Sequence, residues 1–331
     1  MTRLWPPGAA TAVGSLPGAD IVEALRLVFD ELPGLPHLPE LPARGPGAEL
    51  IGRGAALLVD LPVEIAPSGW RLTARPGRDL RRAGDIMARD LDALQRQAEE
   101  YRGALKIQAT GPWTLAASLE LPSGHRVISD HGATRELAAS LAEGLRLHLA
   151  DVARRVPGAS VVLQLDEPSL PAVILGRVPT PSGYGTVRAI EATTVEQTLR
   201  SVLAVAPFGT RAVHCCSSDV PIELLRGAGA DALALDLAAV GDTRRDALGE
   251  AVEAGLSLWV GVVPATDGDI SLESARPPVE RLWAELGFPR GQLASAVVPT
   301  PGCGLAGATP AYARRALRVV AELGRWMSEL G

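Results

Sequence analysis

The chain has 331 residues, of which 47% are hydrophobic and 21% are charged, and its net charge at pH 7 is −6. This composition is globular, and no apolar run approaches the roughly 20 residues of a membrane-spanning helix. The acidic balance argues against nucleic acid and membranes as partners, since both attract basic surfaces, and favours a small-molecule substrate. Residues 1–20 lack the apolar stretch of a secretory signal, so we expect a cytoplasmic protein.

Short apolar runs alternate with longer segments of helical period, which predicts βα units around a parallel sheet. The expected strands are 11–15, 35–41, 105–110, 160–166, 210–215, 232–237, 256–263 and 295–300. The expected helices lie near 20–32, 77–101, 132–156, 193–205, 219–228, 243–254, 274–286 and 309–329. Eight such units in a chain of this length predict a (β/α)8 TIM barrel, with residues 1–331 forming a single domain.

Two insertions interrupt the alternation. Residues 55–75 predict a hairpin around Pro67-Ser68-Gly69, and the Gly/Pro-rich residues 176–188 predict a loop, a candidate lid, on the side where barrels carry their active sites. Lys106 is the only lysine of the chain. Because it opens its expected strand, we expect it towards the opposite end of the barrel, which argues against Schiff-base chemistry.

A His-x-Cys pair ends the fifth expected strand. Strand residues alternate between faces, so His214 and Cys216 project to one side and Cys215 to the other, where it packs. Cys303 follows the eighth strand and Asp236 ends the sixth, and the carboxyl ends of all barrel strands meet at one mouth. Two cysteines and a histidine are ligands that zinc prefers, whereas Asp236 fits a helix N-cap or a carboxylate that caps a loop turn equally well. The pattern predicts a zinc site, with Asp236 as a candidate fourth ligand.

Two further features concern an amino-acid-like ligand. Asp166 and Glu167 close the fourth strand, and a carboxylate there can pair with an α-amino group, although an acidic pair before a proline also fits a simple turn. Ser15 precedes the first helix, where a hydroxyl and backbone amides can hold a carboxylate. The G-x-G-x-x-G run at 302–307 does not predict a dinucleotide site, because no further strand follows it.

Taken together and in this order, four motifs resemble the catalytic barrel of cobalamin-independent methionine synthase: Val-Gly-Ser-Leu-Pro at 13–17, Leu-Asp-Glu-Pro at 165–168, His-x-Cys at 214–216 and Gly-Cys-Gly-Leu at 302–305. The resemblance implies zinc on His214, Cys216 and Cys303, with Asp236 where the family commonly has Glu. It also implies that Ser15 and Asp166 bind the carboxylate and amino ends of homocysteine, with Glu40 as a second partner of the amine.

The sequence departs from this family on the methyl-donor side. Ala306-Gly307-Ala308 stands where Lys and Arg are usual, Val262-Val263-Pro264 lacks the expected catalytic His, and Ser118-Leu119-Glu120 replaces a Trp-Ser-Phe segment, although Trp113 offers a ring nearby. We therefore expect methyltetrahydrofolate to be a poor donor. The donor is then a methylcorrinoid protein or another methyl compound.

Two other hypotheses stay open from sequence. One is a related barrel, either a uroporphyrinogen decarboxylase-like enzyme, which would need no zinc and would place arginines at the mouth, or a corrinoid-dependent methyltransferase. The other is a non-catalytic paralogue that binds zinc or a thiol ligand, which the missing His and Lys/Arg would favour. Metal content would distinguish the decarboxylase from a zinc-dependent methyltransferase. Turnover with several methyl donors would distinguish the binding protein from an active enzyme.

Overall fold

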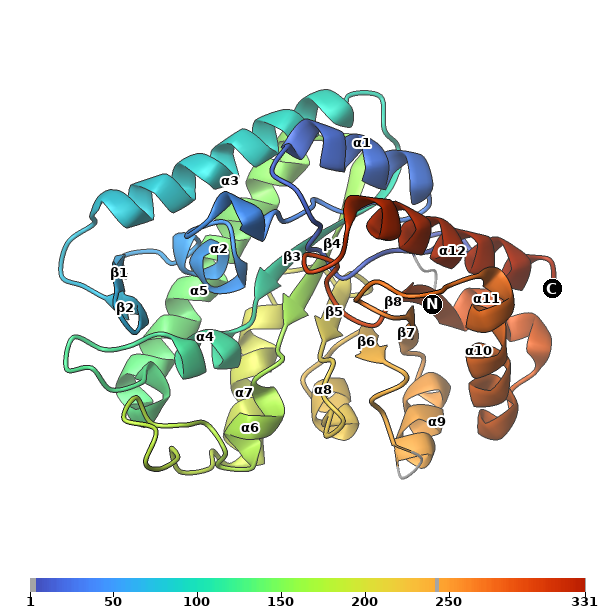
Figure 1. Cartoon of the computed structure of the whole chain (residues 1–331). Coiled ribbons are helices and arrows are strands. Elements are labelled where there is room, and N and C mark those ends of the chain that lie inside the picture. The colour runs from blue at the N-terminus through green and yellow to red at the C-terminus, as the bar shows by residue number, and fades with distance from the viewer. Residues whose placement is uncertain (1–3, 242–243, 331) are drawn as a thin grey trace.

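A computed structural model describes residues 4–241 and 244–330, and its centre is a curled parallel sheet surrounded by helices (Figure 1). The strands follow one another in the order β3-β4-β5-β6-β7-β8. They are β3 (Gly103–Thr110), β4 (Ala159–Asp166), β5 (Arg211–His214), β6 (Ala232–Asp236), β7 (Ser257–Val263) and β8 (Val297–Pro301). All six were expected from sequence, and a strand order that equals the chain order is typical of successive right-handed βα units.

The helices pack their apolar sides against this sheet. The expected ones are α1 (Ile21–Glu31), α3 (Arg78–Gln97), α5 (His131–Arg155), α7 (Ala192–Leu203), α8 (Ile222–Gly227), α9 (Arg245–Glu253), α10 (Leu272–Leu286) and α12 (Pro310–Ser328). Shorter ones were not expected: α2 (Leu50–Ala56), α4 (Pro112–Ser118), α6 (Leu170–Ile174) and α11 (Leu293–Ala296). The expected start of α9 at residue 243 lies outside the described residues. None of the helices in the described ranges is sufficiently long and apolar to span a bilayer.

The expected hairpin insertion is present. β1 (Val63–Ala66) and β2 (Gly69–Leu72) pair antiparallel and pack beside α3. It lies at one edge of the molecule, away from the sheet (Figure 1).

The first two expected strands, 11–15 and 35–41, are not regular strands, and this part of the barrel prediction is wrong. Their residues make only isolated parallel bridges, His37 with Lys106 of β3 and Ser15 with Glu40. The physical cause is the prolines at 36 and 39, which remove ladder donors and leave the amides of Leu38 and Glu40 to bond in opposite directions.

These two segments nevertheless lie between the edges of the six-stranded sheet. The Leu38 amide donates to the carbonyl of Lys106, the Glu40 amide to that of Gly14, and the Thr11 amide to that of Pro299 on β8. Side chains of the neighbouring strands strengthen the connection, because Lys106 Nζ and Gln164 Nε2 each donate to the Val13 carbonyl at 2.8 Å. Buried side-chain bonds thus replace part of a regular ladder.

The close packing of α5 against the chain after α2 gives a test of the fold. A Cβ on Gly144 of α5 would lie 1.7 Å from the backbone oxygen of Leu57, so Gly144→Ala should lower the free energy of unfolding by about 3 kcal/mol or more. The matched control is Gly84→Ala, at an exposed helical position with no neighbour in reach, which should gain about 0.5–1 kcal/mol. Urea unfolding of both variants measures this; equal stability of the two would contradict the packing.

Candidate functional site

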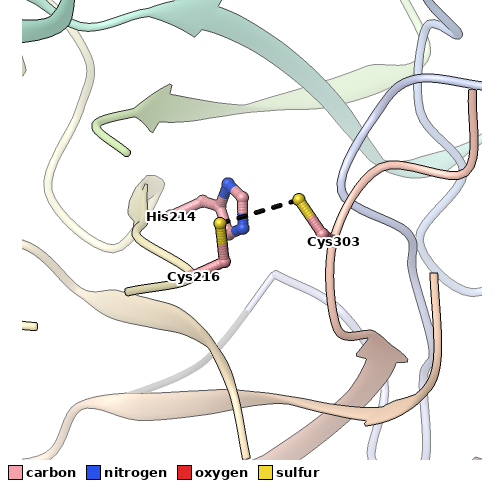
Figure 2. A group of neighbouring side chains, drawn as sticks. All are labelled: His214, Cys216 and Cys303. Atoms are coloured by element: carbon pink, nitrogen blue, oxygen red, sulfur yellow. Dashed lines mark hydrogen bonds between the residues drawn. The ribbon is translucent and has the colours of Figure 1, made fainter. Parts of the chain in front are cut away.

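Three ligand-type side chains converge at the carboxyl end of the sheet. His214 is the last residue of β5, Cys216 lies two residues after it, and Cys303 lies in the loop after β8 (Figure 2). One ligand atom from each lies within 4.8 Å of the others. Cys215 is outside this group and is completely buried in the hydrophobic core, the packing role that the sequence predicted for it.

The two thiols of this group interact directly. The Sγ atoms of Cys216 and Cys303 are 3.6 Å apart, which is within hydrogen-bonding distance for sulfur. The hydrogen bond with Cys216, helped by the nearby His214, lowers the pKa of Cys303 to about 6 against the effect of burial. The same contact and burial raise the pKa of Cys216. One thiolate is therefore already favoured near neutral pH, and thiolates are the form in which cysteines bind metals.

The histidine is oriented by a carboxylate. His214 Nδ1 lies 3.0 Å from Oδ1 of Asp166, and that oxygen also accepts a 2.7 Å hydrogen bond from Gln164 Nε2. The other ring nitrogen, Nε2, is buried with no hydrogen-bond partner among the described residues. A carboxylate on one nitrogen of a metal-binding histidine fixes the tautomer that leaves the other nitrogen free to coordinate. The unpartnered nitrogen and the two thiols fit a zinc ion.

Asp236 ends β6 as expected, but it does not belong to the group of three. Its Oδ1 accepts a 3.0 Å hydrogen bond from the Ala238 amide, the turn cap that the sequence offered as the alternative. A Cβ on Gly302 would lie 3.0 Å from this carboxylate, so the loop that carries Cys303 passes directly beside it. Asp236 as a metal ligand stays a prediction.

The residues expected to bind the substrate line one pocket together with the three ligands. Its volume is about 190 Å³, below the roughly 300–1,000 Å³ of sites for drug-sized molecules, and its lining includes Ser15, Glu40, Asp166, His214, Cys216 and Cys303. The Ser15 carbonyl accepts the Leu305 amide at 2.8 Å, and a Cβ on Gly304 would come within 2.0 Å of Ser15 Oγ. Gly304 therefore lets the Cys303 loop approach Ser15.

Two expected roles are not supported by the geometry. Trp113 does not offer its ring to a ligand, because it is buried and its Nε1 donates to the Val195 carbonyl. Glu167, the neighbour of Asp166, points away from the pocket and accepts the amides of Trp113 and Thr114 at the start of α4. Burial raises the pKa of Glu167 to about 7 against these hydrogen bonds. Its role is to cap that helix.

Sequence reasoning missed the role of Lys106. It is the fourth residue of β3, completely buried, and its Nζ donates to Gln108 Oε1 as well as to Val13. Its expected place at the far end was wrong because β3 begins two residues earlier than expected. Burial lowers the pKa of Lys106 to about 7, partly offset by the charges of Asp166 and Glu40. The signal available in the sequence was that Lys106 is the only lysine of the chain.

Comparison with known proteins agrees with this geometry. Residues 8–325 match the family described as the catalytic domain of cobalamin-independent synthase. The chain belongs to that family. Membership implies a methyltransferase of the methionine synthase type, and the description gives no support to a methylcorrinoid partner.

Two solved structures resemble the fold. One is a B12-independent methionine synthase from Shewanella sp. W3-18-1 in complex with selenomethionine, with a TM-score of 0.63 and 13% identity over 99% of this chain and 98% of that one. The other is a methyltransferase from Methanosarcina mazei, with a TM-score of 0.55 and 15% identity over 98% and 95%. At these identities the likeness concerns the fold. No curated protein matches the chain significantly.

The single lysine makes its titration directly measurable. In protein labelled with ¹³C at the lysine ε-carbon, NMR should show one resonance that titrates near pH 7, because burial disfavours the charged amine. The urea-unfolded chain is the control. Its lysine should titrate near pH 10.4, roughly the pKa of lysine in model peptides. A native midpoint as high as that of the unfolded chain would show that Lys106 is not enclosed as described.

Proposed function

We propose that this protein methylates the sulfur of homocysteine or a closely related thiol, with a zinc ion held by His214, Cys216 and Cys303. The observation that carries the proposal is the placement of these three ligands in the same small pocket as Ser15, Glu40 and Asp166. A metal that prefers sulfur and groups suited to an amino acid are thus within reach of one small molecule.

The chemistry expected of zinc in this site is activation of the nucleophile. A free thiol has a pKa of about 8.5, and coordination to zinc would keep the substrate sulfur deprotonated at neutral pH. An open coordination position is what distinguishes a catalytic site from a structural one. The fourth position would be supplied by Asp236 or by water, and the substrate thiol would take it on binding.

The protein side chains would orient the amino-acid end of the substrate. Asp166 uses Oδ1 to hold His214, so Oδ2 is the oxygen assigned to the substrate ammonium, together with Glu40. The Ser15 hydroxyl and neighbouring amides are assigned to the carboxylate. Because the same Asp166 contacts His214, binding of the ammonium and orientation of the metal ligand depend on one side chain.

The alternative of a decarboxylase-like barrel is less consistent with this pocket. That hypothesis needs arginines at the mouth, and the described residues that line the pocket include none. A turnover assay distinguishes the non-catalytic alternative from an active enzyme, since a binding paralogue would take up zinc and homocysteine and methylate nothing.

The proposed metal site makes a specific prediction about the cysteines. Cys216→Ser and Cys303→Ser should each weaken zinc binding by more than the roughly 10–100-fold that loss of an outer-shell partner costs. Cys215→Ser is the matched control, because this thiol is buried in the core and does not belong to the group of three. Zinc content after purification without chelator, and competition with a chromophoric chelator, measure the effect. Zinc loss in Cys215→Ser with retention in Cys216→Ser would refute the assignment.

The donor side makes a second prediction. A general acid usually contributes about 10²–10⁴-fold, so without the expected His on β7 turnover with methyltetrahydrofolate should be lower than that of a full-length synthase by about this factor. Product methionine, assayed with zinc-loaded protein, homocysteine and a panel of methyl compounds, measures this. A rate with methyltetrahydrofolate equal to that of a full-length synthase would show that the missing residues do not matter.

A further inference from the structure

A buried group of charges lies beside Glu40, one of the residues that line the pocket. Arg53 of α2 donates from Nη1 to Oδ2 of Asp90 on α3 at 2.7 Å. Asp90 is completely buried and only 4% of the Arg53 side chain is exposed. Arg44 adds two further hydrogen bonds to Asp90, at 2.6 and 2.8 Å. A guanidinium fixed in this way has little freedom, because its planar fork is held by a partner that is itself fixed.

The other edge of Arg53 faces Glu40, which lines the pocket. Its Nε lies 3.4 Å from Oε1 of Glu40, and this Nε–H is buried without a hydrogen-bond partner among the described residues. The backbone of Glu40 is held on both sides, since its amide donates to Gly14 and its carbonyl accepts from Leu16. Arg53 is therefore a buried cation that faces the buried Glu40 carboxylate across a short distance.

Glu40 needs such a cation to stay charged. Burial raises its pKa and the nearby Asp166 carboxylate raises it further, whereas Arg53 is the strongest influence in the opposite direction. Two carboxylates that share a small buried pocket do not both ionise unless positive charge compensates them. A neutral carboxyl at Glu40 would be a much weaker acceptor for an ammonium group.

We infer that Arg53 is a positioning residue that holds Glu40 as a charged acceptor for the α-ammonium group of the substrate, and thereby makes the pocket prefer amino-acid thiols to thiols without an amine. This inference rests on the proposed function, in that it takes the ligand of the pocket to be a thiol amino acid. Asp90 contributes by fixing the direction in which Arg53 points.

The test compares two thiols that differ only in the amine. Zinc-loaded protein is titrated calorimetrically with L-homocysteine and with 4-mercaptobutyrate, the same molecule without its amino group. Arg53→Met should weaken homocysteine binding about 10–100-fold, the value of a hydrogen bond to a charged group, and leave 4-mercaptobutyrate unchanged. Arg53→Lys, which retains the charge, should restore part of the loss. In the Arg53→Met variant Asp90 retains its two hydrogen bonds from Arg44, so the Asp90 carboxylate is not left without a partner.

Two further variants guard against a merely structural effect. Arg155→Met is the control for ion pairs to α3, because Arg155 pairs with Asp92 at the surface, and it should change neither affinity. If Arg53 acts through Glu40, the double variant Arg53→Met with Glu40→Gln should bind homocysteine no more weakly than Glu40→Gln alone. This comparison also serves if the single Met variant does not fold, since the double variant leaves no unpaired carboxylate at position 40.

The outcomes are separable. Equal weakening of both thiols by Arg53→Met, additive losses in the double variant, or an undiminished preference for homocysteine would each overturn the role of Arg53 and leave the proposed function standing. A wild-type protein that binds 4-mercaptobutyrate as tightly as homocysteine would instead contradict the amino-acid substrate on which the inference rests.

Discussion

The contact between Asp166 and His214 connects the two halves of the site. Both residues stand at the carboxyl ends of neighbouring strands, where the register pairs them directly, and the Nδ1–Oδ1 distance is 3.0 Å. On one side the histidine presents its buried Nε2 towards the two thiols. On the other, the carboxylate faces the pocket with Glu40 and Ser15. A one-residue shift of either strand would turn one member of the pair to the opposite face and separate the group of His214 and the two cysteines from the carboxylates of the pocket.

Buried polar side chains of the neighbouring strands support this contact. Gln164, two residues before Asp166 on the same face of β4, donates to both Asp166 and the Val13 carbonyl. Lys106 bonds the same carbonyl from β3, so the segment that leads to Ser15 is held by side chains where a regular ladder is absent. Buried polar groups are costly unless they are hydrogen-bonded, and here their bonds fix the position of the irregular N-terminal segments. Stability and site geometry thus depend on the same residues.

Much of this arrangement was predictable from sequence, because βα alternation and strand-end polar residues have strong local patterns. The six strands, the hairpin and the different surroundings of Cys215 and Cys216 follow from a period of two and from turn residues. The first two strands were predicted wrongly, because an apolar run with prolines at 36 and 39 does not show which backbone amides remain to donate to a neighbouring strand. Lys106 was misplaced by a two-residue error in a strand boundary, the least reliable part of such predictions. Arg53 and Asp90 could not be paired, since they are 37 residues apart on different helices and no local pattern links them.

The central claim is that the substrate sulfur enters the coordination sphere of a zinc ion held by His214, Cys216 and Cys303. X-ray absorption at the zinc edge tests it most directly, because Zn–S distances of about 2.3 Å are separated from Zn–N and Zn–O distances of about 2.0–2.1 Å. The account predicts two sulfur ligands in the zinc-loaded protein and three after addition of homocysteine. An unchanged number of sulfur ligands on saturation with homocysteine would contradict it.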